Sequence, residues 1–203
     1  MEKSNIEIII DSVMDGTIGI EQVWQTYGDT IRNTESVSSE AEVLALIGLY
    51  FRYGAKLEID GYLKDAKEYY ESAYQLIGKW KKHISDDQYN HAVEAVLHSL
   101  ANVNGKLEDY KSALPYLKQL KDLFPRKDDY RTAYINCLGS TIAKYTNPVY
   151  IIIAIFFLIK MAEVYVFHTH YIPGWLIDTG WIIWIIMLII QFGLPWVMKR
   201  FMK

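Results

Sequence analysis

The stretch YIIIAIFFLIKMAEVYVF, residues 150–167, decides how this chain is organised. It contains one lysine and one glutamate and is otherwise uncharged. A helix needs about 20 residues to cross the roughly 30 Å hydrocarbon core of a bilayer, and the run that includes this stretch, about 149–167, is long enough. A second apolar run covers about 175–198, and its part from Trp181 onward has no charge. The sequence therefore predicts two transmembrane helices joined by a short turn, with a buried hairpin of a larger soluble core as the alternative.

The residues that flank these runs predict their orientation. Lys144 precedes the first run and three basic residues follow the second, whereas the connecting residues 168–174 contain no lysine or arginine. By the positive-inside rule, both termini lie in the cytosol and only the turn lies outside. Aromatic residues near the ends of the runs fit a membrane interface: Tyr171, Trp175, Trp181 and Trp196. The apolar run near the N-terminus is too short for a signal peptide, so we expect a multi-pass integral membrane protein with a cytosolic N-terminal domain.

Charge divides the chain at the same place. Residues 1–147 carry 17 lysine and arginine against 22 aspartate and glutamate residues, a net charge of −5. This domain is mildly acidic, which argues against nucleic acid as a partner. The single cysteine, Cys137, excludes an intrachain disulfide and fits a reducing compartment. We therefore predict a cytosolic helical domain over 1–147 and a transmembrane hairpin with a short basic tail over 148–203.

Four polar residues fall within the predicted membrane segments: Lys160, Glu163, Asp178 and Gln191. A charged side chain at mid-membrane costs roughly 2.5–3.5 kcal/mol, so these groups should face protein, water or each other. Counting from the turn places Glu163 and Asp178 at similar depth and Lys160 near Trp184. Lys160 then snorkels, or it pairs with Glu163 and Asp178 and so fixes how the hairpin packs. Alternatively, several copies of the chain line a shared polar pathway, or the first span is shortened and does not fully cross.

The N-terminal domain is predicted to be all-helical. Ser or Thr followed three residues later by Glu or Gln marks a helix start, and this pattern occurs at Ser4/Glu7, Ser39/Glu42 and Ser85/Gln88. Asn147 followed by Pro148 fits the start of the first membrane helix. Alternating β-branched runs and hairpin turns are missing from the sequence.

The segment GYLKDAKEYYESAYQLI, residues 61–77, has Ala66, Tyr70 and Ala73 at the spacing found in the second helix of a two-helix repeat. The pattern of the first helix of such a repeat precedes it, at Tyr50, Tyr53, Gly54 and Leu57. These residues resemble a tetratricopeptide repeat, in which small residues let two antiparallel helices approach closely. A weaker second unit combines Leu97, Leu100, Ala101 and Asn104 with Ala113, Leu117, Leu120 and Pro125. Residues 128–145 would close the array, and Trp24–Ile31 forms a partial repeat.

The resemblance implies an antiparallel helix-hairpin solenoid and departs from the family in one respect. Ala66 and Ala113 lie 47 residues apart, whereas the family period is 34, so longer helices or a longer loop must separate them. A generic helical solenoid stays open. The resemblance also implies a groove for a cytosolic protein or peptide, lined by residues of the first helices: Phe51, Arg52, Glu58, His98, Asn102 and Lys106.

No catalytic or metal-binding pattern is present in the sequence: the histidines lack a third ligand at zinc-type spacing, and there is no glycine-rich phosphate loop. We expect neither an enzyme nor a cofactor. The first functional hypothesis is a membrane-anchored module that recruits or scaffolds a cytosolic partner. The alternative is a membrane effector, such as an accessory protein of a bacterial defence system, whose hairpins assemble into a homo-oligomeric pore.

Overall fold

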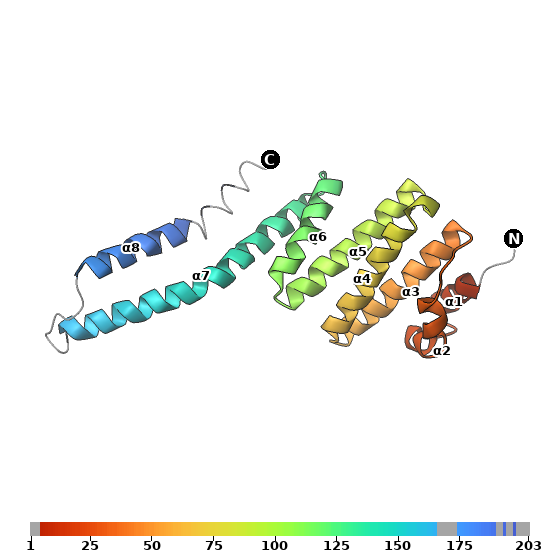
Figure 1. Ribbon diagram of the computed structural model, residues 1–203, viewed down its shortest axis with the longest axis horizontal. Coiled ribbons are helices and arrows are strands. Elements are labelled where there is room, and N and C mark those ends of the chain that lie inside the picture. Colours follow the sequence, from red (N-terminus) through yellow and green to blue (C-terminus); the bar gives the residue numbers. More distant parts are fainter. Residues whose placement is uncertain (1–4, 166–173, 190–192, 194–196, 198–203) are drawn as a thin grey trace. The chain divides into compact units, whose positions relative to one another are not determined.

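The computed structural model describes residues 5–165 and 174–189, together with 193 and 197 (Figure 1). The chain divides into two compact units, Met1–Leu123 and Phe124–Lys203, which are treated separately below. All regular elements in the described part of the chain are helices, so the predicted all-α class is confirmed.

The N-terminal unit contains six α-helices and one short 3₁₀ helix, in the order α1 Asn5–Met14, α2 Ile20–Arg32, α3 Glu40–Ile59, α4 Leu63–Lys79, η1 Lys81–His83, α5 Asp86–Lys106 and α6 Tyr110–Leu123. From α3 to α6, each helix packs against the next one in the chain, and the four lie side by side in Figure 1. This arrangement is compatible with a repeat-like helical domain. The wide spacing between the two predicted repeats is accounted for by a 21-residue α5 and by the η1 segment that precedes it.

The pairing of α3 with α4 depends on the small residue predicted at the crossing point. A Cβ atom on Gly54 would lie 3.0 Å from the Tyr70 ring and 3.3 Å from the Ala66 carbonyl oxygen. A Cβ at this position would therefore require the Tyr70 ring and the α4 backbone to shift, so glycine allows the closest approach. Ala66, Tyr70 and Ala73 are buried on the facing side of α4, as predicted from their spacing. Close contact between small residues, with a large ring beside them, therefore holds this helix pair together.

The α5–α6 pair buries the predicted residues that lie on its two helices, including the polar Asn104, whereas Pro125 lies beyond the end of α6 and is exposed. The Asn104 side-chain amide donates a hydrogen bond to the Leu100 carbonyl oxygen at 2.7 Å. Its Oδ1 atom is buried and has no hydrogen-bond partner within the described residues. A buried acceptor that loses water without gaining a donor destabilises the fold.

We therefore expect Asn104→Leu to stabilise the N-terminal unit. Leucine has the same branching and removes the unsatisfied acceptor, so the free energy of unfolding should rise by about 1–2 kcal/mol. Urea unfolding of the full-length chain in detergent micelles, followed by circular dichroism, measures the change. Asn90→Leu, at an exposed position of the same helix, is the matched control and should change stability by less than about 0.5 kcal/mol. If Asn104→Leu instead lowers the free energy of unfolding, the unsatisfied Oδ1 atom of Asn104 does not destabilise the fold.

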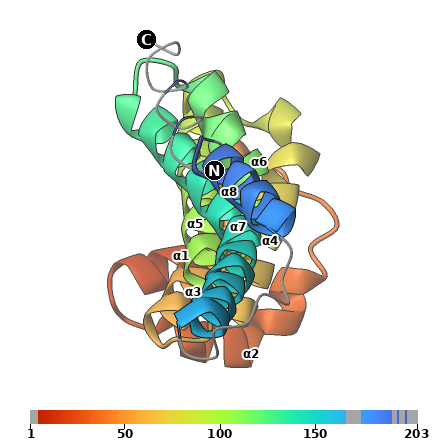
Figure 2. The same cartoon turned by 90° about the vertical axis from the view of Figure 1, so that its left-hand side faces the viewer.

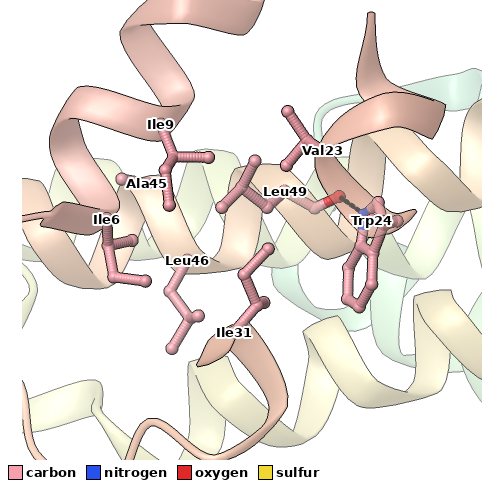
Figure 3. Packing of buried hydrophobic residues seen from close by; sticks show 8 residues of the cluster. All are labelled: Ile6, Ile9, Val23, Trp24, Ile31, Ala45, Leu46 and Leu49. Carbon is pink, nitrogen blue, oxygen red and sulfur yellow. Dashed lines mark hydrogen bonds between the residues drawn. The ribbon is translucent and has the colours of Figure 1, made fainter. Parts of the chain in front are cut away.

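Ahead of the stack, α1 and α2 pack on α3 through a hydrophobic cluster (Figure 3). The cluster consists of Ile6, Ile9, Val23, Trp24, Ile31, Ala45, Leu46 and Leu49. The Trp24 indole nitrogen donates to the Leu49 carbonyl oxygen at 3.4 Å. The segment predicted as a partial repeat thus belongs to a three-helix N-terminal cluster.

Two of the three predicted helix starts lie in the described residues, and they differ. At the start of α3, Ser39 Oγ accepts a hydrogen bond from the Glu42 backbone N–H at 3.0 Å, which confirms the predicted cap. At the start of α5, Ser85 makes no side-chain cap. Its backbone N–H and hydroxyl instead donate to Glu40 Oε1, at 2.7 and 2.6 Å. The Ser85 hydroxyl thus donates to a charged carboxylate from α3, and its oxygen accepts no hydrogen bond from the first N–H groups of α5.

In the second unit, α7 is one helix from Asp128 to Tyr165. The prediction that a new helix starts at Asn147 is therefore wrong. Pro148 lies inside α7, where it lacks the N–H that would bond four residues back. Helical residues precede it, so Asn147 continues a helix instead of capping one. The domain boundary predicted beside it stays a prediction.

Beside α7 lies α8, Gly174–Leu188 (Figure 2). Among the described residues, one helix, Asp128–Ala162 within α7, is long and apolar enough to cross a membrane, and no residue of its most apolar 18-residue window is buried. The described part of α8 has 15 residues, so the second span and the orientation of the termini stay predictions.

Candidate functional site

Three of the six predicted groove residues, Glu58, Asn102 and Lys106, meet in one cluster together with Tyr70, which was not predicted to line the groove. These four residues are here called the Glu58 cluster. Asn102 and Lys106 are four residues apart on α5 and therefore share a face of that helix. Glu58 lies near the end of α3 and Tyr70 on α4. Three helices thus bring their side chains to one carboxylate.

The carboxylate of Glu58 is the acceptor for all three donors. The Tyr70 hydroxyl donates to Oε2 at 2.8 Å. The Asn102 amide and the Lys106 ammonium donate to Oε1 at 2.7 and 2.8 Å. Only 12% of the Glu58 side chain is exposed, compared with 49% of the Lys106 side chain. The charge of Glu58 is therefore held by hydrogen bonds that replace most of its water.

Burial, together with the hydrogen bond to Glu58, raises the pKa of Tyr70 well above its ordinary value. The hydroxyl therefore stays protonated and donates at any physiological pH. The sequence pattern assigns Tyr70 to packing alone. The hydrogen bond from its hydroxyl to Glu58 could not be predicted from spacing, because it depends on where the carboxylate of a residue on another helix lies.

The groove residues consequently fall into two groups. Asn102 and Lys106 of α5 both donate to Glu58 of α3 and so tie these two helices together. Phe51 lies with its ring 5.5 Å from that of Tyr70 and is half-buried, whereas Arg52 and His98 are exposed. An external ligand can reach Arg52 and His98 without breaking the Glu58 cluster.

We expect Tyr70→Phe to destabilise the N-terminal unit by about 1–2 kcal/mol. The substitution keeps the ring but removes one donor from a mostly buried carboxylate. Tyr74→Phe is a matched control, because the Tyr74 hydroxyl makes a bond of the same length, 2.8 Å, to Gln119 at an exposed site. It should cost less than about 0.5 kcal/mol. If the two substitutions lower the free energy of unfolding in urea equally, the hydrogen bond from Tyr70 to Glu58 contributes no more to stability than an exposed one.

A second aromatic group, not predicted as a unit, joins α2, α3 and α4. Trp24 contacts Tyr50, Tyr53 and Tyr69, with ring centroids 4.9, 5.2 and 4.9 Å away. The Arg32 guanidinium lies 5.8 Å from the Trp24 ring and is paired with Asp29 at 2.8 Å. These four rings pack against one another and form a small aromatic core between α2, α3 and α4.

In the apolar part of α7, one set of half-buried residues recurs every three or four positions, as in a helix-packing stripe: Thr146, Tyr150, Ile153, Phe157 and Lys160. Phe156 and Ala162 are half-buried as well and lie off this stripe. The Phe157 ring lies 4.8 Å from that of Trp181. The stripe therefore faces α8, and Lys160 lies on it. The exposed residues Ile152, Ile155 and Leu158 lie between the stripe positions.

The structure describes only part of the other predicted membrane residues. Glu163 belongs to α7 and Asp178 to α8 by their backbones, and their side chains lie outside the description; Gln191 lies outside the described residues altogether. The contact between Phe157 and Trp181 alters the predicted levels. Lys160 comes three residues after Phe157 on α7, so its level on the antiparallel α8 is nearer Asp178 than Trp184.

No group of three His, Cys, Asp or Glu side chains capable of holding a metal ion occurs within the described parts of α1 to α8. Cys137 is buried, and burial raises the pKa of its thiol, which disfavours the nucleophilic thiolate. Comparison of the chain with protein-family models, curated proteins and solved structures finds no match. The function must therefore be argued from the residues themselves.

Proposed function

We propose that this chain is a membrane-anchored helical interaction module that holds a cytosolic protein or peptide at a bilayer. The observation that carries the proposal is the exposure of α7: its most apolar 18-residue window has no buried residue. A core helix of a soluble protein would bury most of such a window. Exposed apolar surface of this extent is the mark of a membrane or protein contact.

Lipid is the contact that fits the pattern of exposure. Isoleucine and leucine are exposed on α7 on the sides away from the stripe that faces α8, and further isoleucines are exposed on α8: Ile151, Ile152, Ile155, Leu158, Ile159, Ile182, Ile183, Ile185 and Ile186. A protein partner would cover one face, whereas a bilayer surrounds a hairpin on every outer face. Backbone hydrogen bonds satisfied within helices also suit the hydrocarbon layer.

The partner would bind the α3–α5 face of the N-terminal unit. Arg52 of α3 and His98 of α5 are exposed, and the ring of Phe51, the residue before Arg52 in the chain, is half-buried. An apolar ring next to polar, exposed side chains is the usual composition of a peptide-binding surface. The Glu58 cluster keeps α3 and α5 together beneath this face and so presents it as one surface.

Flotation with vesicles tests the membrane anchor. The full-length chain is reconstituted with phosphatidylcholine vesicles, washed at alkaline pH and centrifuged through a density gradient. An integral protein floats with the lipid after the wash. A chain that is released by the wash, or that stays soluble without detergent, would contradict the proposal.

The same vesicles test the alternative function, an oligomeric pore. The observation in its favour is the lysine within the apolar part of α7, since charges inside a membrane often mark an ion pathway. A module that only anchors should leave a trapped dye inside the vesicles. Dye release that rises steeply with the protein-to-lipid ratio would instead favour assembly into a pore.

A further inference from the structure

The level and direction of Lys160 along the hairpin are set by two observations. The ring contact between Phe157 and Trp181 fixes which turns of α7 and α8 stand opposite each other. Lys160 lies three residues further along α7, on the same half-buried stripe, while its neighbours Ile159 and Met161 are more than half exposed. The lysine is therefore on the side of α7 that faces α8.

The sequence of α8 supplies one acidic residue, Asp178, three positions before Trp181. In an antiparallel hairpin, three residues forward on one helix and three residues back on the other reach the same level. Residues three apart also share a helix face. The register thus brings the backbones of Lys160 and Asp178 to one level of the hairpin, one turn from the contact between Phe157 and Trp181.

We propose that Lys160 and Asp178 form an ion pair between α7 and α8 inside the bilayer, so that these two charges of the hairpin are neutralised within one chain. This inference rests on the proposed membrane anchor. A charge in hydrocarbon is costly unless it is paired, and pairing within the hairpin removes the need for a second copy. Glu163, three residues further along α7 itself, could neutralise Lys160 but could not tie the two helices.

A cysteine cross-link tests the register. In a Cys137→Ser background, the full-length chain carries Lys160→Cys with Asp178→Cys, or Lys160→Cys with Trp184→Cys as the control. Six residues of helix displace the control site by about 9 Å, beyond the roughly 7 Å Cα separation that a disulfide spans. After oxidation in detergent or vesicles, thiol counting by mass tags should show loss of both thiols in the first variant only. The reverse pattern would overturn the proposal.

Charge exchange tests the pair itself in the flotation assay. Lys160→Asp or Asp178→Lys alone should lower the fraction of chain that floats by at least about tenfold, because each leaves two like charges at one level. The double variant Lys160→Asp with Asp178→Lys should return to within about twofold of the original chain.

Two controls keep this result distinct from failure of the anchor. Glu163→Gln should leave flotation within about twofold, since the glutamate is not the interhelical partner. A double exchange that recovers nothing, or an exchange of Lys160 with Glu163 that recovers as well, would overturn the ion pair. If the unaltered chain does not float, the membrane anchor is wrong, and the cross-link pattern in detergent still decides the register.

Discussion

The double substitution Ile155→Lys with Leu158→Lys should prevent stable insertion of the full-length chain into vesicles. Both residues lie on exposed faces of α7, at 51% and 66% exposure. A lysine near the middle of a membrane helix costs roughly 2.5–3.5 kcal/mol, so the pair costs about 5–7 kcal/mol. The fraction that floats with lipid should therefore fall by more than about a thousandfold, below detection.

The matched control places the same two charges on the N-terminal unit. Ile59 and Tyr62 are exposed, at 83% and 61%, and are also three residues apart: Ile59 ends α3, and Tyr62 lies in the turn that leads to α4. Ile59→Lys with Tyr62→Lys should leave flotation unchanged, because that unit is proposed to lie in water. If the α7 variant floats as well as this control, Ile155 and Leu158 do not face lipid.

Loss of the Trp24 side chain should be the most damaging single truncation in the N-terminal unit. Trp24→Ala is expected to lower the free energy of unfolding by about 3–5 kcal/mol, the range for removal of a large buried aromatic. The indole is only 6% exposed, and it packs against tyrosines from α3 and α4. Its removal opens a cavity where α2, α3 and α4 meet.

Urea unfolding in detergent micelles, followed by circular dichroism, measures this loss. Trp24→Phe should recover part of the stability, because it keeps a ring against the tyrosines but loses the hydrogen bond to the Leu49 carbonyl oxygen. Met14→Ala, at a residue 61% exposed, should change stability by less than about 0.5 kcal/mol. A cost below about 1 kcal/mol for Trp24→Ala would mean that α2 contributes little to the fold.

The parts of the fold that were predictable depend on spacing within one helix or between adjacent helices. The packing of Gly54, Ala66 and Tyr70 was predictable for this reason. Small residues at helical spacing, next to a large ring, indicate a close contact between two antiparallel helices. The cap at Ser39 is also local, since donor and acceptor lie three residues apart. The apolar character of α7 follows directly from its composition.

Other features were not predictable because they depend on competing or distant groups. Ser85 has the pattern of a helix cap, but Glu40, 45 residues earlier in the chain, takes its hydrogen bonds. Pro148 has the pattern of a helix start, but the helix before it simply continues. The Glu58 cluster needs three helices at fixed separations, and side-chain reach across such distances has no signature in the sequence.

The continuity of α7 has a mechanical consequence. At 1.5 Å per residue, its 38 residues extend about 57 Å, nearly twice the roughly 30 Å thickness of the hydrocarbon layer. In the proposed membrane anchor, about half of α7 would therefore extend beyond the hydrocarbon layer. Tilting of α7 within the bilayer would move the part of the helix outside the bilayer sideways. Pro148, which lacks a backbone N–H and leaves one helical hydrogen bond unmade, would be the natural point for α7 to bend.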